Sequence, residues 1–139
     1  MPLTLILLAL ASTAPQQTAR PADAFGRCLK DSSSMLSDAQ CYATEQERLE
    51  AEQKTLLDTL SARLKRPGPP ASDYAAAAAA LAKAQAAWSA YKDADCEIID
   101  HVFGDGNAAG LAGGTCLIDH YRTRNAVLRA WLDEYLSDH

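Results

Sequence analysis

The sequence has few aromatic residues, no excess of basic residues and no long apolar run. Aromatic residues make up 6% of the 139 residues and alanine is abundant, which favours helices over a sheet. Thirteen Lys and Arg against 18 Asp and Glu give a net charge of −5, whereas nucleic-acid binding needs a basic surface. No apolar run reaches the roughly 18 residues of a membrane span. These absences leave a small, acidic, mostly helical domain.

Catalytic motifs are also missing. The sequence contains no G-x-S-x-G, H-E-x-x-H, P-loop or dinucleotide-binding pattern. The adjacent pairs Asp100-His101 and Asp119-His120 do not form relays, because neighbours on a helix point in different directions. The segment 105–107 lacks the spacing and the closing glutamate of a calcium loop. We therefore expect a protein that is not an enzyme and that needs neither cofactor nor metal.

The first 24 residues are typical of an export signal followed by a linker. Residues 3–11 are apolar but too short to cross a bilayer, and the polar segment 12–23 follows them. No basic residue precedes the apolar run, and several small-residue sites fit cleavage, so the cleavage site stays open. We expect residues 1–24 to be signal peptide and linker, and 25–139 to be one domain that is secreted or periplasmic. The alternative is an apolar terminus without a targeting role.

Four cysteines follow this segment. An even number in a small exported domain is typical of two disulfides, and three pairings are possible. The competing interpretation is a zinc site, but its ligand spacing is loose and it leaves two cysteines without a role. The disulfide cysteines are Cys28, Cys41, Cys96 and Cys116, and the zinc set is Cys96, His101, Cys116 and His120.

Three segments show the periodicity of amphipathic helices. Apolar residues at spacings of three and four predict a helix over 37–66, opened by a capping box of Ser37 and Gln40. A second helix is expected from a cap at Ser72 to near Phe103.

The third helix is expected from a cap at Thr115 to about Ser137. Between the second and third helices, residues 104–114 contain five glycines and are predicted to form a flexible loop. The sequence thus predicts an all-α, antiparallel three-helix bundle.

This topology brings the cysteines to one end of the bundle. Cys41 lies near the start of the first helix, Cys96 near the end of the second and Cys116 at the start of the third. The arrangement favours Cys41–Cys96 and Cys28–Cys116 as the two disulfides.

Acidic residues gather at the same end. An acidic surface steers cationic partners toward it, although a solvated surface without a partner is the alternative. The acidic residues expected there are Asp38, Glu45, Glu47, Asp93, Asp95, Glu97, Asp100 and Asp105.

The block Gln85–Cys96 reads Q-A-A-W-S-A-Y-K-D-A-D-C, and Gly113-Gly114, Cys116 and Arg124 follow it. This order resembles the LprI-like family of small exported bacterial proteins, named for a lysozyme inhibitor. The resemblance implies an exported helical domain with disulfides that inhibits lysozyme.

The motif residues have the pattern of structural residues. We expect Trp88 and Tyr91 in the core and Gln85 and Arg124 in hydrogen bonds between helices, with Arg124 paired to Asp93 or Asp95.

Two hypotheses for function follow. The first is a binding protein that occludes a basic lysozyme through the glycine-rich end, with Asp100, Asp105 and Asn107 in contact with the enzyme. The second is an envelope structural or assembly module that binds another protein through its helix faces, such as the face of Ala75–Ala80.

Overall fold

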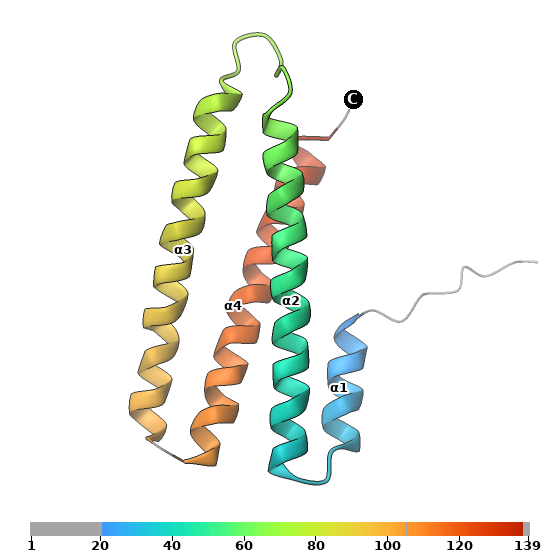
Figure 1. The fold of residues 1–139 in the computed structure, drawn as a ribbon, viewed down its shortest axis with the longest axis vertical. Coiled ribbons are helices and arrows are strands. Elements are labelled where there is room, and N and C mark those ends of the chain that lie inside the picture. Colours follow the sequence, from blue (N-terminus) through green and yellow to red (C-terminus); the bar gives the residue numbers. More distant parts are fainter. Residues whose placement is uncertain (1–20, 105, 138–139) are drawn as a thin grey trace, which may run out of the picture.

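The computed structural model describes residues 21–104 and 106–137, and these residues form four α-helices and no β-strand. The helices are α1 (Pro21–Asp31), α2 (Met35–Leu64), α3 (Tyr74–Phe103) and α4 (Asn107–Glu134). Figure 1 shows the three long helices running antiparallel, with α1 lying along one half of α2. The all-α fold is confirmed. The three-helix bundle is corrected to four helices within the described residues.

Helix α1 is the element that the sequence analysis did not predict. Its 11 residues are too few for a stable isolated helix, so contacts with α2 must hold it in place. The Cys28–Cys41 disulfide joins the two helices, and the ring of Phe25 packs edge-on against that of Tyr42 with centroids 5.1 Å apart. The expected signal peptide falls mainly on residues 1–20, which lie outside the described residues.

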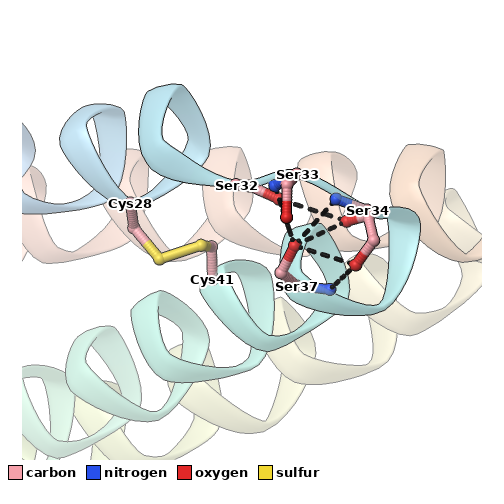
Figure 2. Close-up of a disulfide and its surroundings, with 6 residues drawn as sticks. All are labelled: Cys28, Ser32, Ser33, Ser34, Ser37 and Cys41. Carbon is pink, nitrogen blue, oxygen red and sulfur yellow. Dashed lines mark hydrogen bonds between the residues drawn. A yellow bond between two sulfur atoms is a disulfide. The ribbon is translucent and has the colours of Figure 1, made fainter.

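A cluster of serines forms the turn between α1 and α2 (Figure 2). The Ser34 hydroxyl accepts a hydrogen bond from the Ser37 backbone N–H at 3.2 Å, and the Ser37 hydroxyl accepts one from the Ser34 N–H at 3.0 Å. This reciprocal pair is a capping box, so α2 begins at Met35. The predicted box of Ser37 and Gln40 was therefore wrong by three residues, because a run of serines offers several caps.

The turn between α2 and α3 contains three prolines and one glycine, and the side chains of Ser72 and Tyr74 crowd the glycine. A Cβ on Gly68 would lie 2.3 Å from the Ser72 hydroxyl and 2.7 Å from the Tyr74 ring. Asp73 caps α3 by accepting from the Ala76 N–H at 2.8 Å, while the Ser72 hydroxyl donates to the Pro69 carbonyl. The cap is thus Asp73 and not Ser72 as predicted.

The predicted glycine loop over 104–114 is wrong. Helix α3 ends at Phe103 as expected, Gly104 turns the chain with a φ of 64°, and α4 already begins at Asn107. Helical Gly114 lies so close to Tyr42 that an added Cβ would be 3.0 Å from its ring. Packing against α2 therefore offsets the weak helix propensity of glycine, roughly 1 kcal/mol relative to alanine. The far end of α4 is also corrected, from Ser137 to Glu134.

Helix α4 packs against both α2 and α3, whereas α2 and α3 make few contacts with each other. The core cluster is made of Leu60 and Leu64 of α2, Leu81 of α3 and Leu128 of α4. The α1–α2 and α3–α4 turns lie at one end of the molecule, and the α2–α3 turn lies at the other (Figure 1). No described helix combines the length and apolarity that a bilayer crossing needs.

Candidate functional site

A buried polar network joins the three long helices near their middle. Gln53 of α2 donates to Asn125 of α4 at 3.2 Å and accepts from Gln85 of α3 at 2.9 Å. Asn125, which is 1% exposed, also donates to the Leu49 carbonyl at 2.9 Å, and Arg124 Nε donates to Gln85 at 3.2 Å. The expected interhelical hydrogen bonds of Gln85 and Arg124 are confirmed. Burial lowers the pKa of Arg124.

Toward the disulfide end, the motif residues fasten α3 to α4. The rings of Trp88 and Tyr121 pack edge-on with centroids 5.3 Å apart, and Lys92 Nζ lies 5.5 Å from the Tyr121 centroid. Lys92 is 8% exposed and pairs with Asp93. Burial raises the pKa of Tyr121 to about 12, with further contributions from its hydrogen bond to Glu50 and from the charges of Glu50 and Asp93.

Two predictions for this motif were wrong. Arg124 pairs with neither Asp93 nor Asp95, because Lys92 takes the first and His120 lies 2.7 Å from the second. Tyr91 is 60% exposed and not in the core, and its ring packs edge-on against that of His120 of α4 with centroids 5.4 Å apart. Trp88 is half-buried.

The favoured disulfide pairing is also wrong. The bonds are Cys28–Cys41 and Cys96–Cys116, each joining two helices that follow one another in the chain. The first pair depends on α1, which the sequence analysis did not predict, so Cys28 had no helix to place it beside Cys41. Both bonds lie in the parts of the helices next to the α1–α2 and α3–α4 turns, and these turns share one end of the molecule (Figure 1), as expected.

The Cys96–Cys116 disulfide also contradicts the interpretation of these cysteines as zinc ligands. Cys96, Cys116 and His120 place their ligand atoms within 4.8 Å of one another, but the two sulfurs are bonded together and are therefore not thiolates. The fourth expected ligand, His101, is exposed and lies 3.6 Å from Glu97.

The acidic surface is smaller than the sequence predicted. Glu45 is 4% exposed and lies between Arg48 at 2.7 Å and Arg122 at 2.9 Å. Burial opposes its ionisation, but hydrogen bonds and charges from both arginines outweigh that effect and hold the pKa of Glu45 below its usual value. Asp95 is likewise taken up by His120. Both carboxylates therefore interact with side chains within the fold.

Exposed carboxylates remain where α3 meets α4. We define the α3–α4 tip as residues 93–104 and 106–116. Asp93, Glu97 and Asp100 are exposed and follow one another at spacings of four and three, so they share one side of α3. Of the predicted contact residues, Asp100 belongs to this ridge. Asp105 and the side chain of Asn107 lie outside the described residues.

The α3–α4 tip also carries exposed apolar side chains, which sequence reasoning missed. Ile98 and Val102 are 57% and 70% exposed, and their spacing of four places them together on another side of α3. Phe103, at the end of the helix, is 51% exposed. The sequence shows that these residues are apolar, but it does not show that they lie outside the contact between α3 and α4. The tip thus combines an acidic ridge with an apolar patch.

Most of the chain matches a known protein family. The family model described as lysozyme inhibitor LprI matches residues 28–128, from the first cysteine to the core residue Leu128. No curated protein and no solved structure matches the chain significantly.

Proposed function

We propose that this chain, which belongs to the LprI family of lysozyme inhibitors, inhibits a basic lysozyme by placing its α3–α4 tip over the active-site cleft of the enzyme. The observation that carries the proposal is the family match together with the acidic and apolar side chains exposed at this tip. Occlusion needs a complementary surface and no chemistry. An inhibitor family is also a family of binding proteins and not of enzymes.

Charge supports this choice of surface. A lysozyme is a cationic protein, and the exposed carboxylates of Glu97 and Asp100 would steer it toward the α3–α4 tip, whereas Lys92 offsets the charge of Asp93. Asp105 and Asn107 follow in the sequence, and we keep them as proposed contacts together with Asp100. Because such charges are exposed, their effect lies mainly in the association rate and falls as salt screens it.

Apolar contacts supply the affinity that rim charges do not. Val102 and Phe103 are exposed beside the turn, where a partner would desolvate them first. Binding energy in protein interfaces is concentrated in a few such residues near the centre of the contact. We therefore assign Val102 and Phe103 as the anchors and the acidic ridge as the rim.

Contacts between α3 and α4 hold the α3–α4 tip in place without a partner. The Cys96–Cys116 disulfide and the Asp95–His120 contact at 2.7 Å join the last turns of α3 to the first half of α4. A surface that is already ordered loses less conformational freedom on binding. This bracing replaces the flexible glycine loop of the original hypothesis as the device that presents the surface.

A lysis assay with purified, disulfide-bonded protein tests the proposal. We expect inhibition of lysozyme at micromolar concentration, stronger at low than at physiological ionic strength. Failure to inhibit at either salt concentration would overturn the proposed function.

Matched variants locate the surface. The double variant E97Q/D100N should weaken inhibition by roughly three- to tenfold at low salt. D133N/E134Q removes the same charge from exposed residues at the other end of α4 and should have no effect. Equal losses in both variants would show that net charge matters and the α3–α4 tip does not.

The apolar anchors have their own control. V102S/F103S should weaken inhibition by about 30-fold at both salt concentrations, as expected for central contact residues. L36S changes a leucine that is 78% exposed at the α1–α2 turn and should leave inhibition intact. A larger loss in L36S than in V102S/F103S would move the binding surface to the α1–α2 turn.

The assembly hypothesis has one observation in its favour. Five of the six residues of Ala75–Ala80 are exposed, and only Ala78 is half-buried. Self-association in sedimentation velocity would support this hypothesis, and a monomer at every concentration would count against it. Export stays a prediction, since it depends on the first 24 residues.

A further inference from the structure

The Cys96–Cys116 disulfide lies beside a histidine. Cys116 and His120 are four residues apart in α4 and therefore share one side of that helix. Cys96 meets them from α3, and one ligand atom from each of the three residues lies within 4.8 Å of the other two. Cys96 is 6% exposed, and the side chain of His120 is 16% exposed. Two cysteines and one histidine are thus gathered in a largely buried place between α3 and α4.

The redox state of the two cysteines decides whether this cluster can hold a metal ion. Zinc binds cysteine as the thiolate, so the disulfide keeps both sulfurs from acting as ligands. A dithiol reductant gives two electrons and two protons to the S–S bond, which becomes two thiols, while the reductant becomes a disulfide itself. The two thiols then release two protons when a zinc ion binds both sulfurs.

The spacing of the three residues suits one zinc ion. Zinc bonds to sulfur at about 2.3 Å and to an imidazole nitrogen at about 2.0 Å, so two ligand atoms on one tetrahedral ion lie roughly 3–4 Å apart. The ligand atoms of this cluster are already within 4.8 Å, and the Cα atoms of Cys96 and Cys116 are 5.8 Å apart. Rotation of the side chains can therefore bring both thiolates onto one ion without moving the helices.

Asp95 and Tyr91 fix the position of the histidine. The Asp95 Oδ2 atom lies 2.7 Å from His120 Nε2. Metal-binding histidines usually donate their second ring N–H to such a carboxylate, which sets the tautomer and makes the ligand nitrogen more basic. The ring of Tyr91 packs edge-on against that of His120, with centroids 5.4 Å apart. Both contacts exist in the disulfide form, so the histidine is already oriented before a metal binds.

We propose that reduction of the Cys96–Cys116 disulfide converts this cluster into a zinc site. The protein ligands are Cys96, Cys116 and His120, and a water molecule takes the fourth position. Asp95 is a positioning residue that orients His120. The ion joins α3 to α4 at the same two cysteines as the disulfide, so the α3–α4 tip stays cross-linked under reducing conditions. The exposed His101, which the sequence suggested as a ligand, lies outside the cluster.

Titration with Co²⁺, which reports its coordination in the visible spectrum, tests the proposal without a lysozyme assay. The chain is reduced with dithiothreitol and desalted under argon. We expect one Co²⁺ per chain, with the intense visible bands of a tetrahedral ion and a near-ultraviolet charge-transfer band from thiolate ligands, and we expect Zn²⁺ to displace it. The oxidised chain should show neither band, and reduced C28S/C41S should bind as the reduced wild type does. Absence of binding to the reduced wild type, or equal binding to reduced C96S/C116S, would overturn the proposal.

Two pairs of variants test the other members of the site, each after far-ultraviolet circular dichroism has verified its helix content. H120A removes a ligand and should weaken Co²⁺ binding by more than about 100-fold, whereas D95N loosens only the orientation of that ligand and should weaken it by about tenfold. The controls are H101A, at an exposed histidine of the α3–α4 tip, and D119N, at an exposed residue next to His120. Both controls should bind Co²⁺ as wild type does. Equal losses in H120A and H101A, or in D95N and D119N, would contradict the assigned ligands.

Discussion

Glu45 offers the sharpest test of the charge arrangement, because it was expected on the surface and is instead buried between two arginines. In Glu45→Gln the two guanidinium groups lose their anionic partner. Breaking a fully buried ion pair costs roughly 3–5 kcal/mol. The side chains of Arg48 and Arg122 are 35% and 38% exposed, so water offsets part of that loss. We expect the free energy of unfolding to fall by about 1–2 kcal/mol at neutral pH.

The sign of the pH dependence follows from the lowered pKa of Glu45. Its stabilising contribution is complete above the unfolded-state value of 4.5 and is lost as pH falls through the lower folded-state pKa. Wild type and Glu45→Gln should therefore differ at neutral pH and converge in acid. Urea unfolding followed by far-UV circular dichroism measures this, with exposed Glu47→Gln as the control. A difference that does not change with pH, or an equal loss in Glu47→Gln, would refute the ion-pair argument.

Three further predictions concern the fold. C96S/C116S removes a bond across 20 residues and should lower the free energy of unfolding by roughly 3 kcal/mol, measured with urea; unchanged stability would show that the bond constrains little. Leu128→Ala, at a site with 0% exposure, should cost about 2–5 kcal/mol, and Val127→Ala at its exposed neighbour under about 1; thermal unfolding compares them, and equal shifts would place the core elsewhere. Asn125→Ala leaves the Gln53 amide and the Leu49 carbonyl without their partner, and it should lower the free energy of unfolding by about 1–3 kcal/mol. Urea unfolding measures this, and unchanged stability would show that the buried network contributes nothing.

The long helices could be predicted from the sequence because local signals and periodicity agree there. The leucine repeat of α2 stops before Pro67, and α3 ends at Phe103 directly before a glycine with positive φ. Gln53 is a polar residue at a position of the same apolar repeat. The structure explains it as the residue that links α3 and α4 through Gln85 and Asn125.

The remaining features of the fold depend on contacts between residues that are distant in the sequence. The periodicity of apolar residues carries no information about such contacts. Helix propensity alone places residues 107–114 in a loop, but Gly114 gains contact with Tyr42 that a larger residue would lose. Helix α1 is short and depends on Cys28 meeting Cys41. Without α1, the pairing of the cysteines was argued from an incomplete set of helices, and it came out wrong for both bonds.

For the same reason, the sequence alone could not predict which charges of the candidate site are exposed. The sequence counts carboxylates but does not say which of them face a cation across a helix interface. Glu45 forms an ion pair with Arg122 of α4, and Asp95 lies 2.7 Å from His120 of the same helix, so both carboxylates already have partners within the fold. Asp100 is exposed beside the apolar residues that end α3. The register of α4 therefore decides which acids remain for a partner.

That register also divides the molecule into two unlike ends. The hydrogen bonds of Gln53, Gln85 and Asn125 fix the helices at mid-length. Toward the α3–α4 tip, both disulfides hold the described helices together. Toward the α2–α3 turn, the packing of leucines and the turn itself hold them together. A cross-linked end suits a rigid surface that must be presented unchanged. The proposed binding surface at the α3–α4 tip thus lies at the end that the covalent structure of the protein holds together.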